Sequence, residues 1–222
     1  MCGVVGYFPK FVVADQLMED ERRSAFNRLF YESRIRGHHA YGIAQPDDIG
    51  QGINWYKTGE PFSHLVKNHL NTTLPAIAHT RYCQSGDWHV VENNQPLVVR
   101  SMALAMNGVI HMGTKEEFEL EFGVKCEADN DSEVFLQQIA SAPDSETMLR
   151  QASEALRALR GSFAGVWLAY GRLFVGRNAR RPLWWVDHLG ARWFASTADI
   201  FRRAGFPEAT PVQEGVYDCQ AL

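Results

Sequence analysis

Cys2 is the residue whose type and position allow the most direct chemistry. It lies in the run MCGVVGYF, which occupies residues 1–8. If Met1 is removed, Cys2 carries both a thiol and a free α-amine. An α-amine has a pKa of about 7.7–8.0 and a free thiol one of about 8.5, so the amine can accept the thiol proton near neutral pH. A nucleophile and a general base would then share one residue. The alternative is that Cys2 is an ordinary small buried residue.

Four further segments place polar residues in a fixed order along the chain. They read HTRYCQSG at 79–86, NNQP at 93–96, AMNGVI at 105–110 and NDSE at 130–133. With the N-terminal CGVVG, they resemble the glutaminase domain of class II glutamine amidotransferases, which are N-terminal nucleophile hydrolases that release ammonia from glutamine. The variant they resemble is the one in glucosamine-6-phosphate synthase and amidophosphoribosyltransferase. Each motif is weak alone, and the signal is their shared order behind a cysteine at position two.

The resemblance extends over nearly the whole chain. RGSFAGV at 160–166, GRN at 176–178, RPL at 181–183 and FAST at 194–197 resemble further family segments. The resemblance implies a single glutamine amidotransferase domain over residues 1–222, without a second domain to use the ammonia. We therefore expect L-glutamine as the substrate and an ammonia-accepting synthetase subunit or domain as the partner.

Glutamine carries two charged groups that do not react, an α-carboxylate and an α-ammonium. Arg81 matches the family arginine that binds the carboxylate, a role suited to a planar guanidinium that can donate two charge-assisted hydrogen bonds. The alternative is a surface or strand-end arginine. Asp131 matches the family aspartate that binds the ammonium. Asp131, or Asn130 with Glu133, could instead cap the helix that follows.

Asn107 and Gly108 match the family residues that stabilise the oxyanion of the tetrahedral intermediate. The side chain of Asn107 ends in an NH₂ donor, and Gly108 allows close approach of the backbone. The competing interpretation is a type I′ hairpin turn, which an Asn-Gly pair between apolar runs strongly favours. The sequence alone leaves both interpretations open.

The segment from 81 to 88 resembles the family loop that closes over bound glutamine. The resemblance makes Tyr82, Gln84 and Ser85 candidate substrate contacts. Cys83 lies between them, and we expect it to be a packing residue. Trp88 receives no role from the sequence.

Two positions depart from the family pattern. The run RGHHAYG at 36–42 has His39 where the family has aspartate, and Met106 stands where a histidine usually precedes Asn-Gly. The adjacent pair His38 and His39 could indicate a metal site or a proton relay. The alternative is a loop in which one ring is hydrogen-bonded and the other solvated.

Composition is that of an enzyme domain without unusual partners. The chain has 222 residues, 45% of them hydrophobic, which is enough for one sizeable core. A net charge of −4 provides no basic field for nucleic acid. The four cysteines and eight histidines form no metal-ligand spacing, so we expect neither a metal nor a cofactor. Scattered cysteines and the absence of a targeting or membrane segment predict a cytoplasmic location.

Hydrophobic periodicity predicts strands and helices in separate groups. Strands are expected at 4–8, 41–45, 53–57, 76–81, 102–106, 162–170, 172–176, 183–187 and 192–196. Helices are expected at 15–33, 114–122, 131–140, 145–159 and 198–204. This order favours a layered α+β domain. The family resemblance sharpens it to a four-layer α/β/β/α sandwich of two mostly antiparallel sheets.

The predicted activity is hydrolysis of the glutamine side-chain amide through a Cys2 thioester, with ammonia passed to the synthetase. Two other functions stay open. One is a related N-terminal cysteine hydrolase that cleaves a γ-glutamyl compound or another acyl amide, which activity on γ-glutamyl peptides would distinguish. The other is a non-catalytic regulatory module, against which the retention of Cys2, Asn107 and Asp131 argues.

Overall fold

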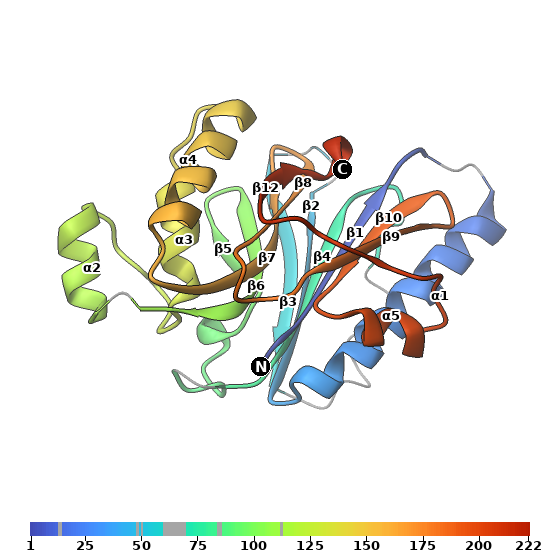
Figure 1. The fold of residues 1–222 in the computed structure, drawn as a ribbon, viewed down its shortest axis with the longest axis horizontal. Helices are drawn as coiled ribbons and strands as arrows, with labels where there is room; N and C mark the ends of the chain where they lie inside the picture. Colours follow the sequence, from blue (N-terminus) through green and yellow to red (C-terminus); the bar gives the residue numbers. More distant parts are fainter. Residues whose placement is uncertain (13–14, 48, 50, 60–69, 84–85, 112) are drawn as a thin grey trace.

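Two antiparallel sheets form the centre of the computed structural model (Figure 1), which describes all residues except 13–14, 48, 50, 60–69, 84–85 and 112. The larger sheet has seven strands in the order β11-β9-β10-β1-β4-β2-β3. In chain order these are β1 (Gly3–Pro9), β2 (Ala40–Pro46), β3 (Ile53–Thr58), β4 (Ala76–Arg81), β9 (Trp184–His188), β10 (Ala191–Ala195) and β11 (Thr210–Pro211).

The smaller sheet has five strands in the order β12-β8-β7-β6-β5. They are β5 (Leu97–Val99), β6 (Met102–Ile110), β7 (Gly161–Ala169), β8 (Arg172–Arg177) and β12 (Gly215–Asp218). Neighbouring strands are antiparallel in both sheets throughout the described residues.

Helices cover the outer face of each sheet, so the layers run α/β/β/α (Figure 1). The seven-stranded sheet packs against α1 (Gln16–Glu32) and α5 (Ala198–Arg203), and the five-stranded sheet against α3 (Ser132–Ile139) and α4 (Ser145–Ala158). α2 (Lys115–Phe122) lies farther out on the side of the five-stranded sheet. Its Phe118 packs into the core between that sheet and the helices α3 and α4. This arrangement confirms the predicted fold class.

The alternation of side chains along β1 explains how one strand serves two cores. Val4 is buried between the sheets, whereas Val5 and Tyr7 are buried under α1 with Phe26. Successive side chains of a strand point to opposite faces, so β1 is apolar on both sides. Its near-continuous apolar sequence is therefore the pattern of a central, fully covered strand.

Local sequence signals set the helix ends. The carboxylate of Asp15 accepts a hydrogen bond from the Leu17 amide at 3.0 Å and caps α1, as predicted. α2 begins with a capping box between Thr114 and Glu117 and ends at Gly123, whose φ of 62° favours glycine.

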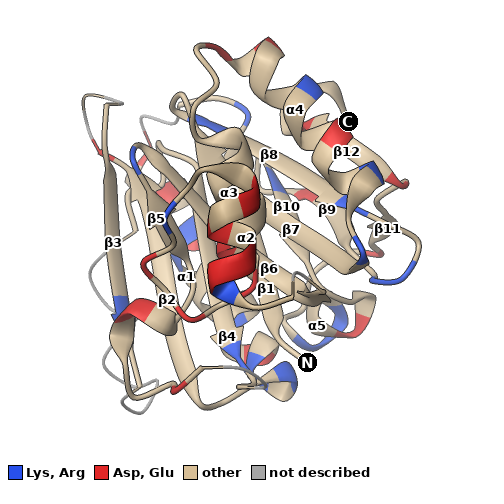
Figure 2. Cartoon of the chain, turned by 90° about the vertical axis from the view of Figure 1, so that its left-hand side faces the viewer, with Lys and Arg blue, Asp and Glu red and all other residues tan. Residues whose placement is uncertain are grey.

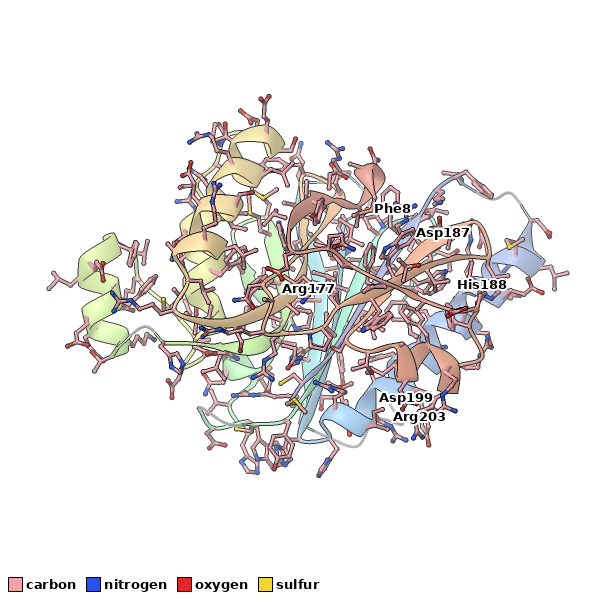
Figure 3. The ribbon with its side chains drawn as sticks, in the orientation of Figure 1. Phe8, Arg177, Asp187, His188, Asp199 and Arg203 are labelled. Atoms are coloured by element: carbon pink, nitrogen blue, oxygen red, sulfur yellow. The ribbon has the colours of Figure 1, made fainter. Side chains whose placement is uncertain are left out.

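Several charged residues of the helices form ion pairs on the surface, although Arg22 of α1 and Glu133 of α3 are buried. Asp199 and Arg203 of α5 form an ion pair one turn apart, at 2.6 Å (Figure 3). Acidic residues gather on α2, whose sequence is KEEFELEF (Figure 2). None of the helices in the described part of the chain has the length and apolar content of a membrane-spanning segment.

The predicted elements all occur, with ends displaced by four residues at most. β4 spans 76–81 as predicted, but β6 runs on to Ile110, four residues past the predicted end. Three short strands were not predicted, namely β5, β11 and β12. They have two to four residues each, which is too short to display an alternating pattern.

Candidate functional site

Cys2 directly precedes β1, the strand that pairs with β4 on one side and β10 on the other. Its backbone is held from two directions: the carbonyl oxygen accepts from Arg36 Nε at 3.3 Å, and the nitrogen donates to Asn107 Oδ1 at 3.2 Å. The thiol lies against Tyr82, with Sγ 3.5 Å from the Tyr82 nitrogen and 3.7 Å from its carbonyl oxygen. Met1 is joined to Cys2 here, so the Cys2 nitrogen is a peptide amide.

Asn107 and Gly108 lie inside β6, where they pair with Ala164 and Phe163 of β7. The hairpin-turn interpretation is therefore wrong. A Cβ on residue 108 would lie 2.0 Å from the Ser162 carbonyl oxygen, so this strand position requires glycine. The Asn107 side chain is buried, and its Nδ2 has no hydrogen-bond partner among the described residues. An unused amide donor thus belongs to the same side chain that accepts from the Cys2 nitrogen.

Arg81 is the last residue of β4 and is buried. Its Nη1 donates to the Asn93 carbonyl oxygen and to Asn94 Oδ1, both at 2.6 Å. It is thus a strand-end arginine, as one alternative held, but not a surface one. The asparagine pair of the NNQP segment fixes one edge of the guanidinium while the residue lines the pocket that also contains Cys2.

Asp131 lies at the start of α3 and lines the same pocket. Its Oδ2 accepts from the Ile110 amide at 2.6 Å, at the end of β6. Asn130, rather than Asp131, accepts from the Ser132 amide, at 3.0 Å. The carboxylate of Glu133 accepts from the amides of residues 127 and 128. Asp131 therefore links α3 to β6 and makes no side-chain hydrogen bond that caps the helix.

Of the predicted substrate contacts on the 81–88 segment, Tyr82 lines the pocket, whereas Gln84 and Ser85 lie outside the described residues. The Cys83 thiol donates to the Gly86 carbonyl oxygen at 2.9 Å, and the Cys83 amide donates to His39 Nδ1 at 2.9 Å. His38 is exposed. The pair therefore matches the loop interpretation, and the described residues contain no cluster of three metal-ligating side chains.

The candidate pocket has a volume of about 280 Å³. It brings together residues from five separate segments: Cys2, Arg81, Tyr82, Gln95, Met106, Gly108, Val109, Ile110, Gly113, Asn130, Asp131 and Ser132. Every described residue of the predicted site lines the pocket except Asn107. The Oδ1 of Asn107 accepts a hydrogen bond from the Cys2 nitrogen.

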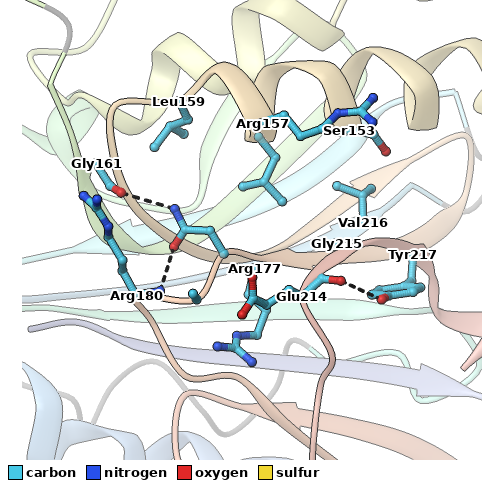
Figure 4. A pocket seen from close by; sticks show the side chains of 13 residues that line it. Ser153, Arg157, Leu159, Gly161, Arg177, Arg180, Glu214, Gly215, Val216 and Tyr217 are labelled. Atoms are coloured by element: carbon cyan, nitrogen blue, oxygen red, sulfur yellow. Dashed lines mark hydrogen bonds between the residues drawn. The ribbon is translucent and has the colours of Figure 1, made fainter.

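A larger groove of about 650 Å³ lies elsewhere, between the end of α4 and β8 (Figure 4). It shares no lining residue with the pocket at Cys2. Its polar groups serve the fold: Arg177 donates to the carbonyl oxygens of Arg181 and Val212, and Asn178 bonds to Gly161 and Arg180. We therefore take the smaller pocket, which is lined by Cys2, Arg81 and Asp131, as the functional site.

Comparison with known proteins gives a consistent assignment. No family model matches the chain. It is 30% identical over 171 residues to glutamine–fructose-6-phosphate aminotransferase (isomerizing) of Fusobacterium nucleatum, covering 74% of this chain and 26% of that protein. It is 25% identical over 225 residues to the Pectobacterium atrosepticum enzyme of the same name, covering 96% and 35%. The chain thus spans about a quarter to a third of the length of these relatives.

The solved structures agree with the sequence matches. Glutamine phosphoribosylpyrophosphate amidotransferase from B. subtilis superimposes with a TM-score of 0.75 at 24% identity, over 99% of this chain and 48% of that one. A glutamine aminotransferase class-II domain protein from Silicibacter pomeroyi gives a TM-score of 0.58 at 15% identity, over 99% and 96%. The chain is a homologue of class II glutamine amidotransferase domains. Because these identities are below 25%, the solved structures support the fold alone. The homology is inferred from the sequence relatives.

Burial is the largest influence on the pKa values of the Cys2 thiol and the Asp131 carboxyl. It raises the pKa of the Cys2 thiol, against the opposing effects of the Tyr82 backbone and the cations of the chain terminus and Arg81. It also raises the pKa of Asp131, although the hydrogen bond from the Ile110 amide favours the carboxylate. The thiol is therefore protonated near neutral pH and needs a base to become a nucleophile.

Sequence reasoning missed the residues that support the site from behind. Gln95 accepts from the Met106 amide at 2.6 Å and donates to Ser132 Oγ at 2.9 Å, joining β6 to α3. His79 lies behind the same strand, fully buried, with Nε2 3.1 Å from the Met106 carbonyl oxygen. Both belong to segments that the family resemblance singles out. That resemblance was the available signal, but it assigned them no role.

Proposed function

We propose that this chain is a glutaminase domain or subunit that hydrolyses the side-chain amide of L-glutamine. In this proposal Cys2 is the nucleophile, and the ammonia passes to a synthetase partner. The observation that carries the proposal is the buried Nδ2 of Asn107, which has no partner in the described part of the chain, while Oδ1 of the same side chain accepts from the Cys2 nitrogen. A buried donor without a partner is costly, and an oxyanion forming beside Cys2 would be its natural acceptor.

The reaction needs Met1 to be removed, because only then is the Cys2 nitrogen an amine. The amine accepts the thiol proton as Sγ attacks the side-chain carbonyl carbon of glutamine, and the resulting oxyanion accepts from Asn107 Nδ2 and the Gly108 region. Collapse of this intermediate releases ammonia, which takes the proton from the amine. Water, deprotonated by the same amine, then hydrolyses the thioester and yields glutamate.

Recognition of the amino acid head group falls to two charged side chains of opposite sign, the buried Arg81 and the partly buried Asp131. Arg81 would bind the α-carboxylate and Asp131 the α-ammonium, and both line the pocket from opposite segments, β4 and α3. Tyr82, Gln84 and Ser85 are proposed as further contacts of the substrate. Ionised Asp131 would bind an ammonium more strongly than a neutral group could, since a buried charge gains most from a paired charge.

The synthetase partner and the cytoplasmic location are also part of this proposal. We propose one amidotransferase domain over residues 1–222 that works in the cytoplasm with a synthetase subunit or domain. The sequence relatives are aminotransferases three to four times as long as the match, which supports ammonia transfer within a larger assembly. Addition of the true partner and its acceptor is expected to raise kcat or lower KM for glutamine.

Replacement of the nucleophile tests the proposal. Cys2→Ala should abolish release of ammonia from glutamine with no loss of folding, because Cys2 lies at the chain end and is only partly buried. Cys83→Ala is the matched control and should keep the activity. A diazoketone analogue of glutamine should add its mass to the peptide that begins at Cys2.

Three outcomes would contradict the proposal. Full activity in Cys2→Ala would remove the nucleophile from the argument. Labelling at Cys83 would move it. Faster cleavage of a γ-glutamyl peptide than of glutamine would favour the related amide hydrolase.

A further inference from the structure

His39 stands where the family pattern has an aspartate, and it contacts the backbone that surrounds the Cys2 thiol. Its amide donates to the Arg81 carbonyl oxygen at 3.0 Å. Its ring nitrogen Nδ1 accepts from the Cys83 amide at 2.9 Å. The residue therefore binds the chain immediately before and immediately after Tyr82.

These two contacts act on the same peptide units that face the thiol. The Arg81 carbonyl and the Tyr82 N–H belong to one peptide unit, and that N–H lies 3.5 Å from Cys2 Sγ. The Tyr82 carbonyl and the Cys83 N–H belong to the next unit, and that carbonyl lies 3.7 Å from Sγ. A peptide unit is planar and rigid. The atom of each unit that His39 contacts therefore restrains the atom of the same unit that faces the thiol.

We propose that His39 is a positioning residue for the Cys2 nucleophile, acting through the two peptide units on either side of Tyr82. The nucleophilic role of Cys2 rests on the function proposed above, whereas the positioning itself does not. Ring packing adds to the hydrogen bonds: the imidazole stacks on Tyr82 at 5.1 Å and on Trp88 at 5.8 Å between ring centroids. The sequence assigned Trp88 no role. In the structure its ring packs against the His39 imidazole and restrains it.

The contact with Cys83 requires a neutral imidazole, because Nδ1 must keep its lone pair to accept a hydrogen bond. Burial, followed by His38, Arg81 and the chain terminus, lowers the pKa of His39. His38 faces the ring edge-on at 4.9 Å. Beyond Trp88 lies His89, whose ring is paired with Asp87 at 2.8 Å. Burial, together with the nearby His38, Arg81 and chain terminus, lowers this pKa and so favours the neutral imidazole at physiological pH.

An imidazole differs from a carboxylate in what acid does to it. As pH falls through the lowered pKa, Nδ1 gains a proton and becomes a donor facing the Cys83 donor, so the hydrogen bond is lost. Tyr82 is then anchored only through the main-chain bond from His39 to the Arg81 carbonyl, so its N–H is held less firmly against the thiolate of Cys2. An asparagine at this position could accept from the Cys83 amide at every pH.

The pKa of the Cys2 thiol tests this proposal without any assay of glutamine. We would measure the rate of alkylation of Cys2 by iodoacetamide from pH 5 to 9, by peptide mass, in the wild type and in three variants. His39→Ala should raise the thiol pKa and lower the alkylation rate at pH 7 about threefold to tenfold, the effect expected for one hydrogen bond. His39→Asn should restore the rate to within about twofold, and His38→Ala, the matched control, should leave it unchanged.

A second measurement follows the contact directly. In the wild type, the Cys83 amide should lose its protection from hydrogen exchange as the His39 ring titrates below its ordinary pKa, and in His39→Asn it should stay protected. An unchanged thiol pKa in His39→Ala, equal effects of His39→Asn and His39→Ala, or an equal effect of His38→Ala would overturn the proposal. If the thiol behaves as expected but no variant or wild type hydrolyses glutamine, the positioning stands and the proposed function fails.

Discussion

Two asparagines flank the same stretch of β7, and their side-chain hydrogen bonding differs. Asn107 is buried, and Asn178 is partly buried. Asn107 pairs with Ala164 through the strand, yet its Nδ2 has no partner among the described residues. Asn178 accepts from the amides of Phe163 and Arg180 at 3.1 and 3.2 Å and donates to the Gly161 carbonyl oxygen at 3.2 Å. Figure 4 shows the bonds to Gly161 and Arg180 at the edge of the larger groove.

The difference is the one expected between a polar residue that stabilises the fold and the oxyanion donor that we propose. A satisfied amide stabilises its surroundings by about 1 kcal/mol per hydrogen bond, whereas an unsatisfied buried donor costs about 1–3 kcal/mol. The fold therefore bears a cost at Asn107 that it avoids at Asn178. A protein retains such a cost where a ligand or an intermediate supplies the missing partner.

Replacement of Asn107 by alanine should have the largest effect on catalysis. Loss of one oxyanion donor lowers kcat by about 10²–10³, with little change in KM. The free energy of unfolding should change by less than about 1 kcal/mol, because loss of the Oδ1 bond from the Cys2 nitrogen is offset by removal of an Nδ2 donor that has no partner among the described residues. Steady-state kinetics and urea unfolding measure the two quantities. An effect confined to KM would assign Asn107 to binding instead.

Asp131 should contribute mainly to binding, and its effect should depend on pH. Burial raises the pKa of this carboxyl, so it protonates at a higher pH than an ordinary aspartate. Since only the carboxylate pairs with the α-ammonium, KM for glutamine should rise as pH falls through the raised pKa. Asp131→Asn should raise KM about 10–100-fold near neutral pH and remove that rise. A variant that keeps the acidic limb of the KM profile would assign the titration to another group.

Asn178→Ala should reverse the pattern seen for Asn107. It removes three side-chain hydrogen bonds, so the free energy of unfolding should fall by about 2 kcal/mol. Once folded, the variant should keep kcat within about threefold, because the groove shares no lining residue with the pocket at Cys2. Urea unfolding and kinetics on the same sample compare the two. A large loss of kcat at an unchanged free energy of unfolding would show that Asn178 acts in catalysis and not in stability.

His79 should have the smallest effect. Its Nδ1 is a second buried atom without a hydrogen-bond partner among the residues that the structure describes, and its Nε2 contacts the Met106 carbonyl oxygen. Burial lowers the pKa of His79 to about 3, from an ordinary value of 6.5. The unfolded chain therefore binds a proton that the folded protein excludes, and stability is lost as pH falls below 6.5. Between pH 7.5 and 5.5 this costs about 1.4 kcal/mol. His79→Gln should be less sensitive over that range, and an unchanged slope in urea unfolding would show that the acid sensitivity lies elsewhere.

The strands and long helices were predictable because their signals are local. Apolar runs such as 76–81 and the capping pattern at Asp15 identify elements without reference to the rest of the chain. The short strands β5, β11 and β12 were not predictable, since a strand of two to four residues exists only where a neighbouring edge accepts it. The pairing of the two sheets across a shared apolar layer likewise came from the family resemblance and not from periodicity.

The sequence by itself determined which residues could form the site: Cys2, Arg81, Asn107 and Asp131 stand out by type and by motif. It could not determine whether Asn107-Gly108 is a turn, because a turn and a strand position that excludes Cβ both select Asn-Gly. Tertiary structure decided this, since the Ser162 carbonyl oxygen fills the space where a side chain on residue 108 would lie. It also decided that His39 reaches the Cys2 thiol through Tyr82. That contact depends on the distances between three segments far apart in the chain, which no local pattern encodes.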